Sequence, residues 1–194
     1  MPDAYLPLRN AINKLQPLTE NEWTDFAQKL IIETYPKGHF LIQAGQIEHY
    51  IYFINSGATR NYFTRGDKEY TVEFHFANEF VTAFYSLITR EPGTVNIELL
   101  ENTEVVVIAY NDLLAFYNRH HHGERIGRLI AEYQYARRLR KEMDLLALSA
   151  EERYAQLMSR NPELIQNLSV KHLSSYLGIQ PESLSRIRKL YARN

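Results

Sequence analysis

Cysteine is absent from this 194-residue chain, which excludes disulfide bridges, thiolate-bound zinc and thiolate-held iron–sulfur clusters. An excess of charge is also absent, because 22 Lys and Arg stand against 23 Asp and Glu, a formal net charge of −1. The chain as a whole therefore has no general attraction for nucleic acid or for an anionic membrane. It lacks an apolar signal segment and any hydrophobic run near the roughly 20 residues that cross a membrane. We expect a cytoplasmic protein with no membrane partner.

The charge is distributed unevenly along the chain. Residues 147–194 hold seven Lys and Arg against four Asp and Glu, an excess of +3, while the remainder carries −4. A mildly basic end behind an acidic body is typical of a DNA-binding segment attached to a sensor.

The pattern of residues 169–194 predicts a helix-turn-helix. Ser169 is a good N-cap for a first helix, and Gly178 suits the sharp turn that follows it. Pro181 and Glu182 favour the first turn of a second helix. The polar side chains left on the outer faces suit a helix lying in the major groove: Ser183, Ser185, Arg186, Arg188 and Lys189. The alternative is a basic helical hairpin whose charged face is merely solvated.

The middle of the chain has the texture of β structure. Short alternating runs are separated by glycines and other turn residues, which predicts a sandwich or barrel. The runs are 40–43, 50–55, 58–64, 70–76, 80–84, 95–100 and 105–110. Helices are expected before them, at 6–16 and from a Thr19–Glu22 capping box to about residue 31.

A long helix is expected over about residues 124–148. Apolar residues three and four positions apart form a seam suited to a two-stranded coiled coil. The predicted dimer residues are Ile126, Leu129, Tyr133, Ala136 and Met143. The alternative is a helix packed on its own β domain, and we expect both faces to be used.

This order of elements resembles the cyclic AMP receptor protein/FNR (Crp/Fnr) superfamily of bacterial transcription regulators. The stretch YPKGHFLIQAGQIEHYIYFINSGATRNYF, the ARRL of 136–139, RYAQLM and LGIQPESLSRIRK carry the resemblance. It implies an α+β fold: an N-terminal jelly-roll barrel (a double-stranded β-helix) of the cyclic-nucleotide-binding type, a dimerisation helix and a winged-helix-like helix-turn-helix. The implied domains are 1–118, 119–148 and 149–194. Only three residues follow Tyr191, so the wing is expected to be truncated.

The resemblance also implies roles for residues and partners. Ser169 and Lys171 would contact DNA phosphates, and Glu182 and Arg186 would read base edges, while Ser183, Arg188 and Lys189 add phosphate or flanking contacts. Pro181 stands where the family has an Arg, so one base contact is expected to be missing. The partners implied are double-stranded DNA, a second copy of the chain and RNA polymerase.

The sensor half departs from the family's nucleotide-binding pattern. Ala83 stands where the ribose-binding Glu belongs and Gly93 where the phosphate-binding Arg belongs; only Thr94 remains. The sequence therefore argues against cyclic AMP, unless Arg90 replaces the missing Arg, and implies no cofactor. The expected effector pocket comprises Val81, Thr82, Ala83, Phe84, Tyr85, Thr94 and Asn96. It would take a more apolar molecule, helped by its aromatic residues, or be filled by its own side chains.

Other constellations give weaker hypotheses. Glu73, His75 and His49 could suggest a cupin-like metal site, and residues 120–122 are three consecutive histidines, but neither set has the spacing of a metal site. No Ser-His-Asp grouping, P-loop or dinucleotide fingerprint is present, so we expect no enzyme. The rival hypotheses are a small-molecule-binding protein with a vestigial helix-turn-helix and a cupin-type metalloenzyme.

Overall fold

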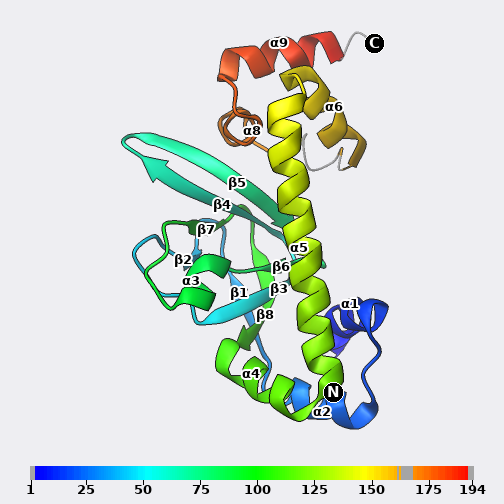
Figure 1. Ribbon diagram of the computed structural model, residues 1–194. Helices are drawn as coiled ribbons and strands as arrows, with labels where there is room; N and C mark the ends of the chain where they lie inside the picture. Colours follow the sequence, from blue (N-terminus) through cyan, green and yellow to red (C-terminus); the bar gives the residue numbers. More distant parts are fainter. Residues whose placement is uncertain (1–2, 161, 163–167, 192–194) are drawn as a thin grey trace. The chain divides into compact units, whose positions relative to one another are not determined.

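The structure is a computed structural model that describes residues 3–160, 162 and 168–191 (Figure 1). The chain divides into two compact units that are interleaved in sequence. The first contains residues 1–63 and 73–132, and the second contains residues 64–72 and 133–194. Residues 64–72 thus group with the C-terminal part of the chain rather than with the strands on either side of them.

Two four-stranded sheets form the barrel of the first unit. One sheet has the order β1-β8-β3-β6 and the other β2-β7-β4-β5. Strand β8 lies antiparallel to both β1 and β3, and β7 lies antiparallel to both β2 and β4. The bounds are β1 Ile31–Tyr35, β2 Phe40–Ile42, β3 Tyr50–Ser56, β4 Ala58–Arg65, β5 Lys68–Phe76, β6 Phe80–Val81, β7 Asn96–Leu99 and β8 Thr103–Ala109. The predicted jelly-roll barrel is thereby confirmed.

The N-terminal helices close one end of this unit. A 3-10 turn η1 (Asp3–Tyr5) leads into α1 (Leu6–Leu15) and α2 (Glu20–Ala27). The predicted capping box is present: the Thr19 hydroxyl accepts from the Glu22 N–H, and the Glu22 carboxylate accepts from the Thr19 N–H. Trp23 and Phe26 of α2 enter a core shared with β3, β8 and the following helices.

Helices α4 (Tyr110–Arg119) and α5 (His121–Ala147) pack closely because two glycines leave room for aromatic rings. A Cβ added to Gly123 would lie 2.4 Å from the Phe116 ring. A Cβ added to Gly127 would lie 2.2 Å from the Tyr117 hydroxyl. The absence of side chains at these two positions lets the start of α5 pack closely against α4.

The second unit contains the C-terminal helices α6 (Ala150–Arg160), α8 (Val170–Leu177) and α9 (Pro181–Tyr191). Arg153 of α6 donates to the backbone carbonyls of Leu148 and Leu177, which end α5 and α8. A guanidinium at two helix C-termini satisfies carbonyls that have no partner within their own helix. The Tyr154 and Tyr191 rings meet edge to face, with centroids 5.5 Å apart.

Two local expectations were wrong. The helix expected to reach about residue 31 ends at Ala27, and residues 31–35, for which no element was expected, form strand β1 because they pair with β8. The predicted strand over 80–84 ends at Val81, and an unexpected helix, α3 (Phe84–Thr89), follows. The histidines at 121 and 122 begin α5.

Candidate nucleic-acid interface and sensor barrel

The helix-turn-helix has the local geometry that the sequence predicted. The Ser169 hydroxyl accepts from the His172 N–H at 3.1 Å and caps α8. Gly178 ends α8 with φ +70°, in the left-handed region that favours glycine. The Ile179 N–H reaches back to the Ser174 carbonyl at 3.0 Å, which tightens the turn into α9.

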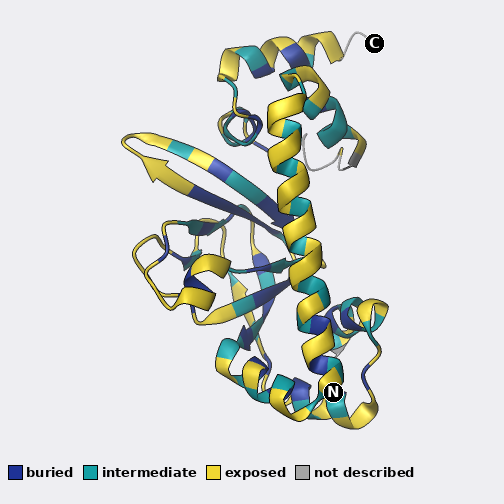
Figure 2. Ribbon diagram, viewed as in Figure 1, coloured by how far each residue is buried: buried dark blue, intermediate teal, exposed yellow. Residues whose placement is uncertain are grey.

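The two helices bury one side and expose the other (Figure 2). Their buried side consists of Leu173, Leu177, Leu184 and Ile187. On α9, Glu182, Ser185, Arg186 and Lys189 are exposed, whereas Ser183 and Arg188 are half-buried. The helix therefore presents an acceptor, a hydroxyl and two cations to solvent, which are groups that contact base edges and phosphates.

Besides Ser169, which caps α8, two more of the predicted DNA-contacting side chains are engaged within the chain. The Ser185 hydroxyl donates to the Pro181 carbonyl at 3.0 Å. The Lys171 ammonium forms an ion pair of 2.8 Å with the carboxylate of Glu69. Glu69 lies in residues 64–72, which we call the hairpin tip, where β4 turns into β5.

The hairpin tip contacts the helix-turn-helix in a way that sequence reasoning missed. The Ser175 hydroxyl of α8 donates to the Glu69 carbonyl and accepts from the Thr71 N–H, each at 2.8 Å. Lys141 of α5 donates to the Val72 carbonyl. These partners are about 70 to 106 positions apart in sequence, and no local pattern marks them.

The interior of the barrel is occupied largely by its own apolar side chains. Strand β4 faces β7 with Thr59 opposite Leu99 and Asn61 opposite Ile97, so these four share one face of the sheet. Ile97 and Leu99 are fully buried. The Thr59 hydroxyl and the Asn61 side-chain carbonyl are buried without a hydrogen-bond partner among the described residues.

Glu48 brings a carboxylate into the barrel wall, with an exposed fraction of only 2%. Its oxygens accept from the N–H groups of His49 and Tyr50 at 3.0 Å and of Ala83 at 3.4 Å. Burial raises the pKa of Glu48 above its usual value, and these hydrogen bonds oppose that rise. Ala83 itself has no carboxylate, but its backbone N–H contacts the carboxylate of Glu48.

The comparison with protein families gives one match within the barrel. The family described as the cyclic nucleotide-binding domain matches residues 32–120, which are thus similar to that domain. None of the curated proteins matches the chain in sequence.

Several solved structures share the fold of the chain. FixK2 from Bradyrhizobium japonicum is 17% identical, with a TM-score of 0.74 over 84% of this chain and 85% of that one. A transcriptional regulator of the Crp/Fnr family from Eubacterium rectale is 14% identical, with a TM-score of 0.71 over 90% and 84%. The catabolite activator protein of Thermus thermophilus is 22% identical, with a TM-score of 0.56 over 94% and 87%. The resemblance to the Crp/Fnr superfamily is thus confirmed in the fold.

Most of the predicted effector-pocket residues lie around the start of α3, within residues 32–120. Val81 and Ala83 are buried and face the barrel core. Phe84 and Tyr85 are 56% and 67% exposed, so they do not line an enclosed interior. The aromatic residues Phe84 and Tyr85, which were expected to line the pocket, are therefore surface residues.

The polar members of the predicted pocket are used within the domain. The Thr82 hydroxyl donates to the Tyr50 carbonyl at 2.8 Å, and the Asn96 side chain accepts from the Ala44 N–H at 3.0 Å. Thr94 is exposed. Arg90, the possible replacement for the missing phosphate-binding Arg, donates to the Asn111 side chain at 3.1 Å and lies over the Tyr110 ring. It is thus engaged at the start of α4.

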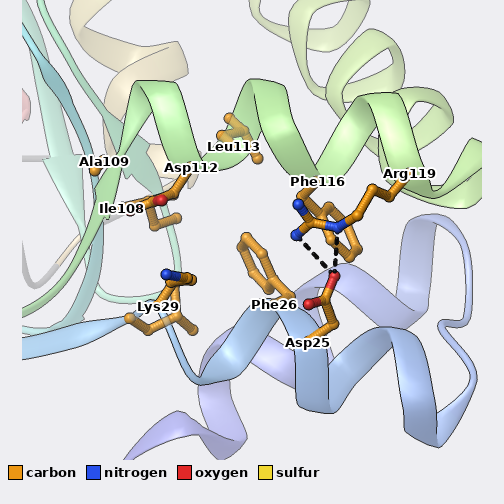
Figure 3. Close-up of a pocket in the computed structure, with 10 residues that line it drawn as sticks. Asp25, Phe26, Lys29, Ile108, Ala109, Asp112, Leu113, Phe116 and Arg119 are labelled. Carbon is orange, nitrogen blue, oxygen red and sulfur yellow. Dashed lines mark hydrogen bonds and ion pairs between the residues drawn. The ribbon is translucent and has the colours of Figure 1, made fainter.

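A small cavity lies between α2, the end of β8 and α4 (Figure 3). Its volume of about 10 Å³ holds roughly one water molecule, far less than a metabolite requires. Asp25 at its rim accepts from Arg119 at 2.9 Å and pairs with His120 at 2.8 Å. His122 pairs with Glu22 at 3.0 Å. His120 and His122 thus pair with carboxylates of α2.

The described residues contain no group of three or more His, Cys, Asp or Glu arranged to hold a metal ion. His75, the central residue of the cupin-like hypothesis, lies 3.6 Å from the Glu79 carboxylate. Nor is any helix among the described residues long and apolar enough to span a membrane. The truncated wing expected after Tyr191 concerns residues 192–194, which lie outside the described part.

The predicted dimer residues on α5 fall into two groups. Ile126 is only 6% exposed and packs in the core of its own domain, so its place in the seam was wrong. Leu129 is half-buried, whereas Tyr133, Ala136 and Met143 are exposed. Leu139 and Leu146, which are not among the predicted dimer residues, are also exposed and continue the stripe at the spacing 136, 139, 143, 146.

Proposed function

We propose that this protein is a non-enzymatic, dimeric transcription regulator that binds double-stranded DNA in the cytoplasm. The observation that carries the proposal is the α8–α9 pair, with its apolar side buried and Glu182, Arg186 and Lys189 exposed on α9. The regulators of known structure that share the fold support it.

Specific recognition is assigned to the exposed groups of α9. Arg186 would donate in bidentate fashion to guanine, and Glu182 would accept from the cytosine amino group. Lys189, Arg188, Ser183 and Ser169 would supply phosphate or flanking contacts, which position the protein without reading sequence. Ser185 would need to exchange its bond to Pro181 for one to DNA.

Dimerisation is assigned to the exposed stripe of α5. Tyr133, Ala136, Leu139, Met143 and Leu146 lie on one side of the helix and offer apolar surface to a second copy. A dimer would present two recognition helices to half-sites about one DNA turn apart. RNA polymerase is a further proposed partner of the DNA-bound dimer.

Effector binding is assigned to the barrel, whose interior is filled largely by apolar side chains and would have to open for a ligand to reach the buried oxygens of Thr59 and Asn61, which have no partner among the described residues. Cyclic AMP is not proposed, because Ala83 and Gly93 supply neither a carboxylate for the ribose nor a guanidinium for the phosphate. The effector proposed here is a small, mostly apolar molecule with a hydrogen-bond donor.

The test is selection of duplexes from a random pool by the purified protein, followed by anisotropy titrations at two salt concentrations. We expect a two-fold symmetric selected sequence and an affinity that falls steeply with salt as phosphate counterions are released. Failure to enrich any sequence, with salt-independent binding, would instead favour a small-molecule-binding protein whose helix-turn-helix is vestigial.

A further inference from the structure

The hairpin tip and α8 form a contact inside the second unit. Residues 64–72 lie in the middle of the barrel sequence, yet they group with residues 133–194 rather than with the barrel. Strand β5 is the last strand of its sheet, so one of its edges has backbone groups that no neighbouring strand can pair.

Ser175 fills part of that open edge. Its hydroxyl donates to the Glu69 carbonyl and accepts from the Thr71 N–H, both at 2.8 Å. One side chain thus satisfies a donor and an acceptor of the same strand, as a neighbouring strand would. A contact of this kind fixes the register of α8 along the strand.

Two lysines add charge to the same contact. The Lys171 ammonium pairs with the Glu69 carboxylate at 2.8 Å. Lys141 donates to the Val72 carbonyl, and its ammonium lies 3.7 Å from the centre of the Tyr176 ring of α8. The rest of the hairpin tip carries Arg65, Asp67 and Lys68, so it has little net charge to attract or repel DNA.

Glu69 pairs with Lys171, the cation that the resemblance to the Crp/Fnr superfamily implies as a DNA phosphate contact. An ammonium that is paired with a carboxylate at 2.8 Å must exchange that partner before it can pair with a phosphate. We propose that the hairpin tip is an autoinhibitory latch on the helix-turn-helix, in which Glu69 and the DNA backbone compete for Lys171. This inference rests on the proposed DNA binding. By linkage, whatever releases the tip strengthens DNA binding, and DNA binding releases the tip.

The first test removes the charge of the competitor. Glu69→Gln keeps the size of the side chain, and Asp67→Asn removes the same charge two residues away as a matched control. The probe is a duplex of about 40 base pairs, long enough for two half-sites one turn apart. We expect Glu69→Gln to bind about two- to fivefold more tightly, the range of an exposed ion pair. Asp67→Asn should change the affinity by less than about twofold. Equal effects of both variants would overturn the latch.

The second test locks the contact. Because the chain has no cysteine, Thr71→Cys with Ser175→Cys introduces a single possible disulfide at the point where the backbone of β5 meets α8. We expect the disulfide to form, and the oxidised protein to bind the duplex at least about fivefold more weakly than the same protein after reduction. Equal affinity in the two redox states, or failure of the bridge to form, would overturn the proposal.

The two tests separate the latch from the proposed function. If the wild-type protein binds with steep salt dependence while oxidation and Glu69→Gln leave its affinity unchanged, only the latch fails. If no variant binds duplex DNA in a salt-dependent way, the DNA-binding function fails and the latch fails with it.

Discussion

Glu48 is a carboxylate held by backbone N–H groups in an otherwise apolar wall. Because burial raises its pKa in the folded protein, the folded state binds the proton more tightly than the unfolded state. The free energy of unfolding contributed by Glu48 therefore decreases as the pH rises from the ordinary pKa of 4.5 through the raised one.

Substitutions of Glu48 test this arrangement by denaturant unfolding at several pH values. Glu48→Ala leaves the N–H groups of His49 and Tyr50 without their acceptor, so we expect a loss of about 1–3 kcal/mol at neutral pH. Glu48→Gln keeps one oxygen for these groups and cannot ionise. Its loss should be smaller, and its stability should lack the Glu48 contribution to the pH dependence. A Gln variant as unstable as the Ala variant would contradict this role.

Arg186 and Lys189 are both exposed cations on α9. In the proposed function Arg186 contacts a base, whereas Lys189 contacts a phosphate. Arg186→Ala should cost about 1–3 kcal/mol on the selected DNA sequence and much less on unrelated DNA, because a base contact is lost. Lys189→Ala should weaken both by similar factors and reduce the salt dependence, because a phosphate contact is lost. Titrations of both variants on both DNAs check this. Equal losses for Arg186→Ala on the two DNAs would contradict its base-reading role.

At the scale of elements, the junction between α4 and α5 depends on the absence of a side chain at Gly123. An alanine inside a helix ordinarily stabilises it by up to about 1 kcal/mol relative to glycine. At Gly123 the added Cβ would lie 2.4 Å from the Phe116 ring, so steric overlap dominates. We expect Gly123→Ala to lower the unfolding free energy by about 1–3 kcal/mol. Thermal or denaturant unfolding measures this, and adding Phe116→Leu should recover part of the loss. A more stable Gly123→Ala protein would show that the ring has free space.

The contact between α2 and the α4–α5 junction is acid-sensitive. Hydrogen bonds from Arg119 and then His120 lower the pKa of Asp25 below its ordinary 3.8. A lowered pKa contributes stability above the ordinary value and loses it as the pH falls through the folded value. Asp25→Asn should therefore be less stable than the wild type at neutral pH and should lose less on acidification below about pH 4. Acid titration of unfolding checks this, with Asp112→Asn, from the same cavity, as a charge-matched control that should follow the wild type.

At the scale of the whole molecule, the proposed dimer depends on one stripe of α5. Leu139 and Leu145 are 45% and 44% exposed, yet they lie about 120° apart around the helix, so Leu145 is outside the stripe. Leu139→Glu puts a charge in the proposed seam and should shift the protein toward monomers, whereas Leu145→Glu should leave the dimer intact. Sedimentation over a concentration series measures both. Two variants that dissociate alike, or a wild-type monomer, would contradict the seam.

Local signals in the sequence predicted the ends of helices well. The caps at Thr19 and Ser169 and the turn at Gly178 each depend on residues within a few positions, so a short stretch contains all the information. The barrel followed from regular spacing of alternating runs, and the exposed face of α9 followed from helical periodicity.

Contacts between distant segments could not be predicted in this way. Strand β1 exists because β8 pairs with it about 70 residues later, and residues 31–35 alone carry no sign of that partner. Periodicity placed Ile126 on an apolar stripe but could not say that its own barrel covers it. The docking of Ser175 on β5 depends on the placement of two segments more than 100 residues apart.

The interleaving of the two units has a consequence for how the chain is made. Synthesis delivers residues 64–72 early, but their partners in α8 emerge about 100 residues later. The outer edge of β5 therefore lacks its contact with α8 during the interval in which all strands of the barrel have already been synthesised. A nascent chain arrested before residue 170 would carry a finished barrel with a bare edge, which a second nascent chain could pair with. The contact of α8 with this edge can therefore form only after residues 170–177 have been synthesised.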